Sequence, residues 1–533
     1  MIARGRRSAT EKGAASCVEA HNETMQRRDL LKLLAVSPVA AAAAELGLLP
    51  APSAQAASPD VEIELTAAPG TAALLPGAPT SVWQYTARLL RGPAQTLQPL
   101  PGSYLGPVIR VRRGQRVRVH FRNRLPEPSI VHWHGLDVPD AADGHPRLAV
   151  DAGREYTYDF EVVNRAGTNW YHPHPHMRTA YQAYHGLAGL FLVSDPEEAA
   201  LGLPSGDGEL VFALQDRRFD ASNQFVYASG GMTGGGMGRG GMMQMMETMN
   251  GWLGDRTLVS GRVQPSIPVD RRTYRVRLLN GSNARIYKLA WSNGQPIVVI
   301  GTDGGLLAAP KTQPFLTLAP GQRADVVLDL SAQAPNTDVR LESVAFPEEA
   351  VGRMGMMGGN VPLPQGAPLT LATLKVSATQ GPRYQVPARL SADTFVAAPT
   401  APVRRVPLTF MRMTWLIDGR TYDMAETTPA ETVAPGSTHI WEFTNQPNPM
   451  GMAMAHPIHM HGRQFRVIGR SGGTANALRE GIHDQGWTDT VLVLPGETVR
   501  VQVTFSTYPG LYLYHCHILE HEDMGMMRNF RIR

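Results

Sequence analysis

Four short histidine clusters in the outer thirds of this 533-residue chain limit the ways in which it can fold. Each cluster contains a His-x-His pair, and the last pair encloses a cysteine. Single His-x-His pairs are common by chance, but four in one chain are not. The clusters are His132-Trp133-His134, His172-Pro173-His174, His456-Pro457-Ile458-His459-Met460-His461, and His515-Cys516-His517 with the later His521 and Met526. If the clusters act together, the first and last thirds of the chain must face each other.

The last pair predicts two neighbouring centres on one strand. Residues i and i+2 of a β-strand point to the same side, so His515 and His517 face one centre while Cys516 faces another. Only a short length of covalent backbone then separates the two centres. Such a link is a short route for electrons.

A cysteine with two histidines and a weak axial methionine is the ligand set of a blue-copper electron-transfer site. Zinc binds similar ligands but cannot move electrons. The candidate ligands here are Cys516, His456 and His521, and the axial candidate is Met526, with Met524 and Met527 close to it. The other eight histidines can hold three metals: His132, His134, His172, His174, His459, His461, His515 and His517.

The bulk composition suits a globular protein of about three domains. The net charge of +4 is small for the length, and the basic residues form no long runs, which gives nucleic-acid binding little support. The two cysteines are Cys17 and Cys516. Because Cys17 precedes a targeting segment, one cysteine remains in the mature chain, and it cannot form an internal disulfide.

Apolar and polar residues alternate in several segments, for example over 117–121, 274–278 and 499–505, which predicts strands with one buried face. The 42 prolines and 53 glycines supply turns and argue against long helices. A weak repeat, Gly114-Gln115-Arg116, Gly321-Gln322-Arg323 and Gly496-Glu497-Thr498, leads into three of the apolar strands. It predicts three similar β-sandwich domains over 58–200, 201–380 and 381–533.

Three segments lie outside this pattern. Residues 229–251 and 353–360 consist largely of Gly and Met, and we expect both to be flexible exposed loops. Residues 1–57 read as an N-terminal extension and a twin-arginine signal peptide, with Arg27-Arg28 before an apolar stretch and Ala54-Gln55-Ala56 as a cleavage site. Translation starts at either Met1 or Met25, and an ordinary secretory signal is the alternative. No other segment is long and apolar enough to span a membrane.

The chain resembles the multicopper oxidase family, in particular its bacterial laccases and the exported cuprous oxidases of the copper-efflux type. The motifs that carry the resemblance are His-Trp-His-Gly, Trp-Tyr-His-Pro-His, His-Pro-Ile-His-Met-His-Gly and His-Cys-His-Ile-Leu-Glu-His-Glu-Asp-Met-Gly-Met-Met. The resemblance implies an all-β fold of three cupredoxin-like Greek-key β-sandwich domains and four copper ions. It implies a type 2 copper on His132 and His459, a type 3 pair on His134, His172, His174, His461, His515 and His517, and a type 1 copper on His456, Cys516, His521 and Met526.

Reduction of O2 also needs protons, and two carboxylates match acidic positions that the family uses near its copper cluster. These are Glu522, next to His521, and Asp143, which follows the first motif. Either is a plausible proton donor. The alternative is that both are surface carboxylates in ion pairs.

The reductant is the open question. Thioether sulfur prefers Cu(I), and Met454 matches a substrate-copper methionine of the cuprous oxidases, whereas Met452 stands where they place an acidic ligand. Their large Met-rich insertion early in the third domain is missing, so we expect the type 1 edge to be open to phenols and aromatic amines. For the Met-rich segment at 229–251 we favour an interaction with copper. The alternative is a flexible Gly-rich linker in which methionine serves only as an adaptable apolar side chain.

Three readings compete. The first is an oxidase of Cu(I), of phenols and aromatic amines, or of both, with O2 as electron acceptor and a role in copper tolerance. The second is an envelope protein that sequesters copper without turnover, and the third is a copper-free scaffold of the same fold; intact ligands disfavour both. A two-domain nitrite reductase is disfavoured, because the chain is too long and a three-copper cluster has no role there. We expect a periplasmic protein that is a monomer and has no nucleic-acid partner.

Overall fold

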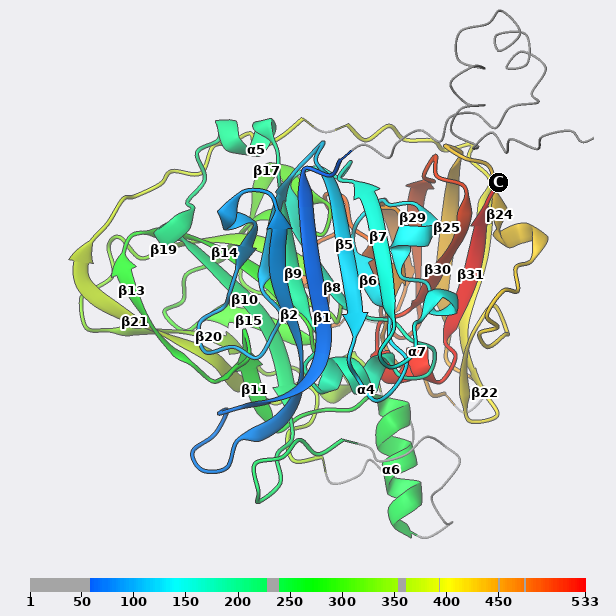
Figure 1. The fold of residues 1–533 in the computed structure, drawn as a ribbon, viewed down its shortest axis with the longest axis horizontal. Coiled ribbons are helices and arrows are strands. Elements are labelled where there is room, and N and C mark those ends of the chain that lie inside the picture. Colours follow the sequence, from blue (N-terminus) through cyan, green and yellow to red (C-terminus); the bar gives the residue numbers. More distant parts are fainter. Residues whose placement is uncertain (1–57, 228–238, 353–360, 393, 449–450, 474–475) are drawn as a thin grey trace, which may run out of the picture. The chain divides into compact units, whose positions relative to one another are not determined.

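The computed structural model describes residues 58–533, apart from 228–238, 353–360, 393, 449–450 and 474–475, and apart from the side chains of 239–244. The expected signal peptide, the first half of the Met-rich segment and the run at 353–360 therefore lie outside the described residues. The described part folds as three β-sandwiches of two sheets each, as expected (Figure 1). Within it, no helix is both long and apolar enough to cross a membrane.

The first sandwich carries the first two histidine clusters. Its sheets have the strand orders β2-β1-β5-β7 and β3-β4-β9-β8-β6. The strands are β1 (Val61–Ala72), β2 (Thr80–Arg91), β3 (Leu97–Gln98), β4 (Val108–Arg112), β5 (Arg116–Asn123), β6 (Val131–His134), β7 (Glu155–Glu161), β8 (Gly167–Pro173) and β9 (Gly189–Ser194). On β5 the residues alternate between buried and half-buried, which agrees with the predicted period of two.

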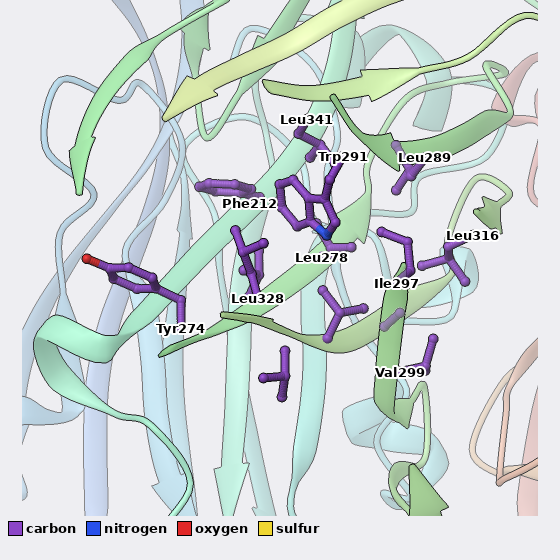
Figure 2. Packing of buried hydrophobic residues seen from close by; sticks show 14 of the residues in the cluster. Phe212, Tyr274, Leu278, Leu289, Trp291, Ile297, Val299, Leu316, Leu328 and Leu341 are labelled. Carbon is purple, nitrogen blue, oxygen red and sulfur yellow. The ribbon is translucent and has the colours of Figure 1, made fainter. Parts of the chain in front are cut away.

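The middle sandwich has sheets of order β12-β11-β10-β14-β19-β16-β17 and β13-β21-β20-β15-β18. Its strands are β10 (Glu209–Arg217), β11 (Arg256–Val259), β12 (Arg262–Val263), β13 (Ser266–Arg271), β14 (Thr273–Asn280), β15 (Tyr287–Trp291), β16 (Ile297–Thr302), β17 (Gly305–Gln313), β18 (Leu316–Leu318), β19 (Arg323–Asp329), β20 (Asp338–Ser343) and β21 (Leu369–Gln380). Figure 2 shows Phe212, Leu278, Trp291 and Leu341 meeting in its apolar core.

The third sandwich carries the other two clusters, in sheets of order β23-β22-β25-β29-β27 and β24-β31-β30-β26-β28. Its strands are β22 (Val403–Met411), β23 (Thr414–Ile417), β24 (Thr432–Val433), β25 (Thr438–Asn445), β26 (His456–Met460), β27 (Phe465–Gly472), β28 (Thr490–Val493), β29 (Glu497–Thr504), β30 (Gly510–Cys516) and β31 (Met527–Ile532).

The same mixed pairing recurs in each sandwich. Two pairs of parallel strands stand among antiparallel neighbours: β1 with β5 and β4 with β9, β10 with β14 and β13 with β21, β22 with β25 and β24 with β31. A parallel pair cannot be joined by a tight hairpin, so each requires a connection that crosses over the sandwich, as in a Greek key. In the described part of the chain the six sheets draw their strands from 61–194, 209–380 and 403–532. The boundaries at 200 and 380 stay a prediction.

Helices are short and lie in the connections. They are α3 (Asp140–Asp143), α4 (Thr179–Tyr184), α5 (Pro196–Ala200), α6 (Arg239–Asn250) and α7 (Leu519–Asp523), with 3-10 turns at Ala94–Thr96, Pro146–Leu148, Gly206–Gly208, Glu348–Ala350, Pro429–Glu431 and Arg479–Gly481. Helix α6 lies below α7 in Figure 1 and contacts it.

The prediction that 229–251 is a loop is wrong for its second half, which forms helix α6. Methionine favours helices, and Met249 at the end of α6 is fully buried in the core of the third sandwich. Gly251 follows the helix in the left-handed conformation, with a φ of 82°. That is the usual way to end a helix, so local propensity and tertiary packing both support α6.

Candidate metal centres

Strand pairing brings the four histidine clusters together. In the first sandwich β6 and β8 are antiparallel neighbours, so that His132 lies opposite His172. In the third, β26 and β30 are antiparallel neighbours, so that His459 lies opposite His515. Each register places two His-x-His pairs side by side, and all of these side chains are buried.

The eight histidines of the first and third sandwiches then meet in one cluster. The Nε2 atoms of His132 and His459 lie 3.3 Å apart, although the residues belong to different sandwiches. The Nε2 atom of His515 lies 3.4 Å from that of His174 and 3.1 Å from that of His461. These nitrogens can hold one metal between His132 and His459, and a second among the other three.

A third group forms around His172. Its Nε2 atom lies 3.4 Å from Nδ1 of His134, and the ring of His517 is 5.5 Å from that of His172 and 5.0 Å from that of His134, between centroids. The indole of Trp170 packs against all three rings. These contacts are compatible with one pair and two groups of three, but His132 also lies within metal-binding reach of His134 and His172. The assignment of the eight histidines to individual metals stays a prediction.

The outward nitrogens of several of these imidazoles lie close to an acceptor oxygen. His132 Nδ1 lies 2.6 Å from the backbone carbonyl oxygen of Asp143, and His461 Nδ1 lies 2.7 Å from a carboxylate oxygen of the same residue. Oxygens of Glu522 lie 3.3 Å from His515 Nδ1 and 3.5 Å from His174 Nδ1. An acceptor on one ring nitrogen fixes the tautomer and leaves the other nitrogen free for a metal.

Asp143 and Glu522 are therefore buried beside the cluster, which excludes the surface ion pairs that were the alternative. Burial raises the pKa of both carboxyl groups well above their usual range, and for Glu522 the nearby Asp523 adds to this. The carboxyl groups of Asp143 and Glu522 therefore retain a proton beside the histidines at neutral pH more readily than an exposed carboxyl group does.

Sequence reasoning missed a third carboxylate, Asp489. Its Oδ1 atom lies 3.0 Å from His134 Nε2, and its backbone oxygen lies 2.9 Å from His459 Nδ1. It is fully buried and forms a two-pronged ion pair with Arg323 of the middle sandwich. No motif marks Asp489 in the sequence, because its role follows from the pairing of β28 with β26.

Burial also keeps the imidazoles neutral. It lowers the pKa of most cluster histidines well below 6.5, with neighbouring histidines adding to the effect, and it lowers that of His172 to about 3. Neutral imidazole is the form that binds a metal. The histidines whose pKa is lowered therefore need no deprotonation to bind a metal at neutral pH.

The predicted second centre is equally compact. Cys516 Sγ lies 3.4 Å from His456 Nδ1 and 3.6 Å from His521 Nδ1, and all three side chains are buried. Met526 is buried in the same core cluster, and its backbone carbonyl accepts a hydrogen bond from the Cys516 N–H. Burial raises the pKa of the Cys516 thiol, so a thiolate there requires a bound cation.

The donor chemistry fits copper. A buried thiolate with two imidazoles and a thioether is a copper set, and clustered imidazoles also suit copper. Among the described residues, both ring nitrogens of His517 are buried without a hydrogen-bond partner, which is costly unless another ligand satisfies them. A metal held with His134 and His172 would satisfy one of them.

Contrary to expectation, the type 1 edge is not open. His521 Nε2 lies 2.9 Å from the backbone oxygen of Met249 on α6, and the Trp415 indole N–H donates to the same oxygen at 3.1 Å. The Trp415 ring also packs against His456 and His521. The missing third-domain insertion is thus replaced by a helix from the middle sandwich.

A cavity of about 370 Å³ lies beside this cover. Met454 lines it together with Glu247 and Asn250 of α6 and Ile518. Met452 is half-buried and packs against the third-sandwich core. Of the two predicted substrate-copper methionines, Met454 therefore lines the cavity beside α6.

The comparisons with known proteins agree with this geometry. Two family models described as multicopper oxidase match residues 82–198 and 397–533. The multicopper oxidase mco of Staphylococcus haemolyticus is 30% identical over 81% of this chain and 83% of its own length. The crystal structure of the McoA multicopper oxidase from Aquifex aeolicus matches with a TM-score of 0.73 and 34% identity, covering 89% of this chain and 97% of that one. A cell division protein FtsP from Photorhabdus laumondii is 31% identical over 80% of this chain and 82% of its own. By sequence and by fold, this chain belongs to the multicopper oxidase family.

Proposed function

We propose that this protein is an oxidase with four copper ions, in which a type 1 copper on His456, Cys516, His521 and Met526 accepts electrons. The type 2 copper is held by His132 and His459, and the type 3 pair by His134, His172 and His517 and by His174, His461 and His515. When bound, the copper ions supply one-electron oxidation of a reductant and four-electron reduction of O2 to water. The observation that carries the proposal is strand β30, where Cys516 meets His456 and His521 while its two neighbours join the histidine cluster.

The protein's own residues orient the ligands and hold protons. Asp143 and Asp489 accept hydrogen bonds from outward imidazole nitrogens, which turns the opposite nitrogens inward. Glu522 lies between His174 and His515, so a proton on its carboxyl group is held at the edge of the cluster. We propose Glu522 and Asp143 as the proton donors of the reaction.

For the reductant we favour Cu(I), with phenols and aromatic amines as secondary substrates. The proposed type 1 histidines are fully buried beneath α6 and Trp415, which disfavours direct contact with a bulky aromatic substrate. Met454 lines the adjoining cavity, and a thioether favours Cu(I). A role in copper tolerance and a periplasmic location, reached by twin-arginine export, follow from this proposal.

The alternative of copper sequestration without turnover has less support. Storage needs no thiolate centre joined by one strand to a histidine cluster. The scaffold alternative gains a precedent from the similarity to FtsP, but this chain keeps all twelve proposed ligands, and buried groups of histidine and cysteine that could hold a metal support the oxidase.

The test is oxygen consumption by purified, copper-loaded protein with Cu(I) and with 2,6-dimethoxyphenol, each with and without added Cu(II). We expect efficient Cu(I) turnover, and phenol turnover that depends on added Cu(II). Strong phenol turnover without added copper would instead make the protein a laccase. The control is Cys516→Ser, which should fold, bind cluster copper and lack both the blue colour and oxidase activity; full activity in this variant would refute the electron-entry assignment.

A further inference from the structure

The repeat Gly-Gln-Arg occurs in the first and middle sandwiches, and the third has Gly496-Glu497-Thr498 in its place. All three glycines have positive φ, at 86°, 84° and 76°, so each repeat forms the same turn before a strand. Only the middle copy is buried at the metal centre. This difference suggests a role for Gly321-Gln322-Arg323 beyond the turn itself.

The glycine of the middle copy contacts a proposed copper ligand. A Cβ atom at Gly321 would lie 2.9–3.1 Å from three atoms of the His517 ring, which is too close. At Gly114 of the first copy, by contrast, a Cβ atom would meet nothing within 4 Å. The backbone of the middle sandwich therefore forms a wall against which the His517 ring rests.

Arg323 binds both outer sandwiches. Its Nη1 atom donates to Asp489 Oδ1 at 2.7 Å and its Nη2 atom to Asp489 Oδ2 at 2.5 Å, while Nε donates to the backbone oxygen of Thr168 on β8 at 2.9 Å. The Arg323 side chain is fully buried, and Asp489 in turn accepts from His134. Arginine alone offers this planar fork of donors.

The neighbouring histidine motif makes room for this ion pair. Gly135 directly follows His134 with a φ of 97°, and a Cβ atom there would lie 2.5 Å from Arg323 Nη2 and 3.1 Å from Asp489 Oδ2. Gln322 adds a hydrogen bond from its amide to the backbone oxygen of Thr490, next to Asp489. Gly321 thus contacts the His517 ring, while Gln322 and Arg323 bind the segment that holds His134 in place.

We propose that Gly321-Gln322-Arg323 is a positioning element for the trinuclear site, supplied by the one sandwich that contributes no copper ligand. Arg323 fixes the Asp489 carboxylate, Asp489 fixes the His134 tautomer with Nδ1 toward His172, and Gly321 sets the place of the His517 ring. Two of the three histidines of one type 3 group, His134 and His517, are held in this way. The inference rests on the proposed copper assignment.

The experiment compares Arg323→Lys and Gly321→Ala with the matched variants Arg116→Lys and Gly114→Ala in the first copy. The first copy is a fair control because Arg116 is partly exposed and pairs with Asp159 away from the metal centres. Each protein is assayed for copper per chain, for blue thiolate absorbance, for the paramagnetic resonance signal of the non-blue copper, and for the melting temperature of the copper-free form.

We expect Arg323→Lys and Gly321→Ala to keep the blue absorbance and to lose cluster copper, with affinity reduced about 10–100-fold, as for other outer partners of metal-bound histidines. The first-copy variants should match the wild type. Unchanged copper content and resonance signal in both middle-copy variants would overturn the inference, and so would an equal loss of blue and cluster copper in both, which would indicate a general folding role. A wild-type protein without blue absorbance would instead refute the proposed function.

Discussion

A buried network of hydrogen bonds and ion pairs beside strand β30 allows a quantitative test of stability. Glu431 accepts hydrogen bonds from Arg528 at 2.9 and 3.0 Å and from the Tyr514 hydroxyl at 2.9 Å, and its side chain is fully buried. Tyr514 directly precedes His515 on β30. The network therefore anchors the strand that joins the two centres.

The size of the effect follows from the Glu431 pKa. Burial opposes the ionised form, but the hydrogen bonds from Arg528 and from the Thr428 N–H outweigh it and lower the pKa from 4.5 to about 2. That difference corresponds to about 3 kcal/mol of folding free energy. Because the folded-state pKa is depressed, the stabilisation is present above pH 4.5 and is lost as the pH falls toward 2, with about half remaining near pH 3.

We therefore expect Glu431→Gln to lower the free energy of unfolding of the copper-free protein by about 3 kcal/mol at pH 7, with a smaller difference from wild type in acid. Urea unfolding at several pH values measures both. The control is Glu426→Gln, which removes another partner of Arg528 whose side chain is 43% exposed, and which should cost less than about 1 kcal/mol. Equal effects of the two substitutions, or a Glu431→Gln effect that does not shrink in acid, would refute the reasoning.

Two further predictions concern the copper centres. Asp143→Ala leaves His461 Nδ1 without its acceptor, so we expect about a 10–100-fold loss of cluster-copper affinity or oxygen consumption with the blue absorbance retained; wild-type turnover would contradict this. Trp415→Ala removes the ring that covers His456 and His521, at a cost of about 3–5 kcal/mol in stability, and should raise phenol oxidation relative to Cu(I) oxidation. Kinetics with both reductants measure the ratio, and an unchanged ratio would show that Trp415 does not limit access.

The sequence predicted the sandwich fold and located the histidine clusters, because strand periodicity and closely spaced ligands are local signals. It also predicted that the first and last sandwiches face each other, since neither pair of clusters is complete alone. It could not reveal Asp489 or the role of Arg323. A lone aspartate and an arginine in a turn carry no spacing signal, and their meeting depends on how three sandwiches pack.

Helix α6 shows the other limit of local reasoning. A stretch rich in Gly and Met reads as a linker, yet Met249 is buried where the third sandwich leaves apolar surface to cover. That contact joins residues from two sandwiches and has no counterpart in the local pattern. The same contact explains why His456 and His521 are buried although the third sandwich lacks the insertion.

The assembly of the cluster from both outer sandwiches has a consequence for folding order. His174 and His515, whose rings meet, are 341 residues apart, and His132 and His459 are 327 residues apart. Contacts of such long sequence separation form late, because the intervening chain must first be ordered. The first sandwich can fold while the rest of the chain is still being synthesised, but its four cluster histidines then lack half of their partners. Under the proposed copper assignment, stable loading of the cluster must follow synthesis of the last sandwich, and the rate at which that sandwich docks limits how fast active protein accumulates.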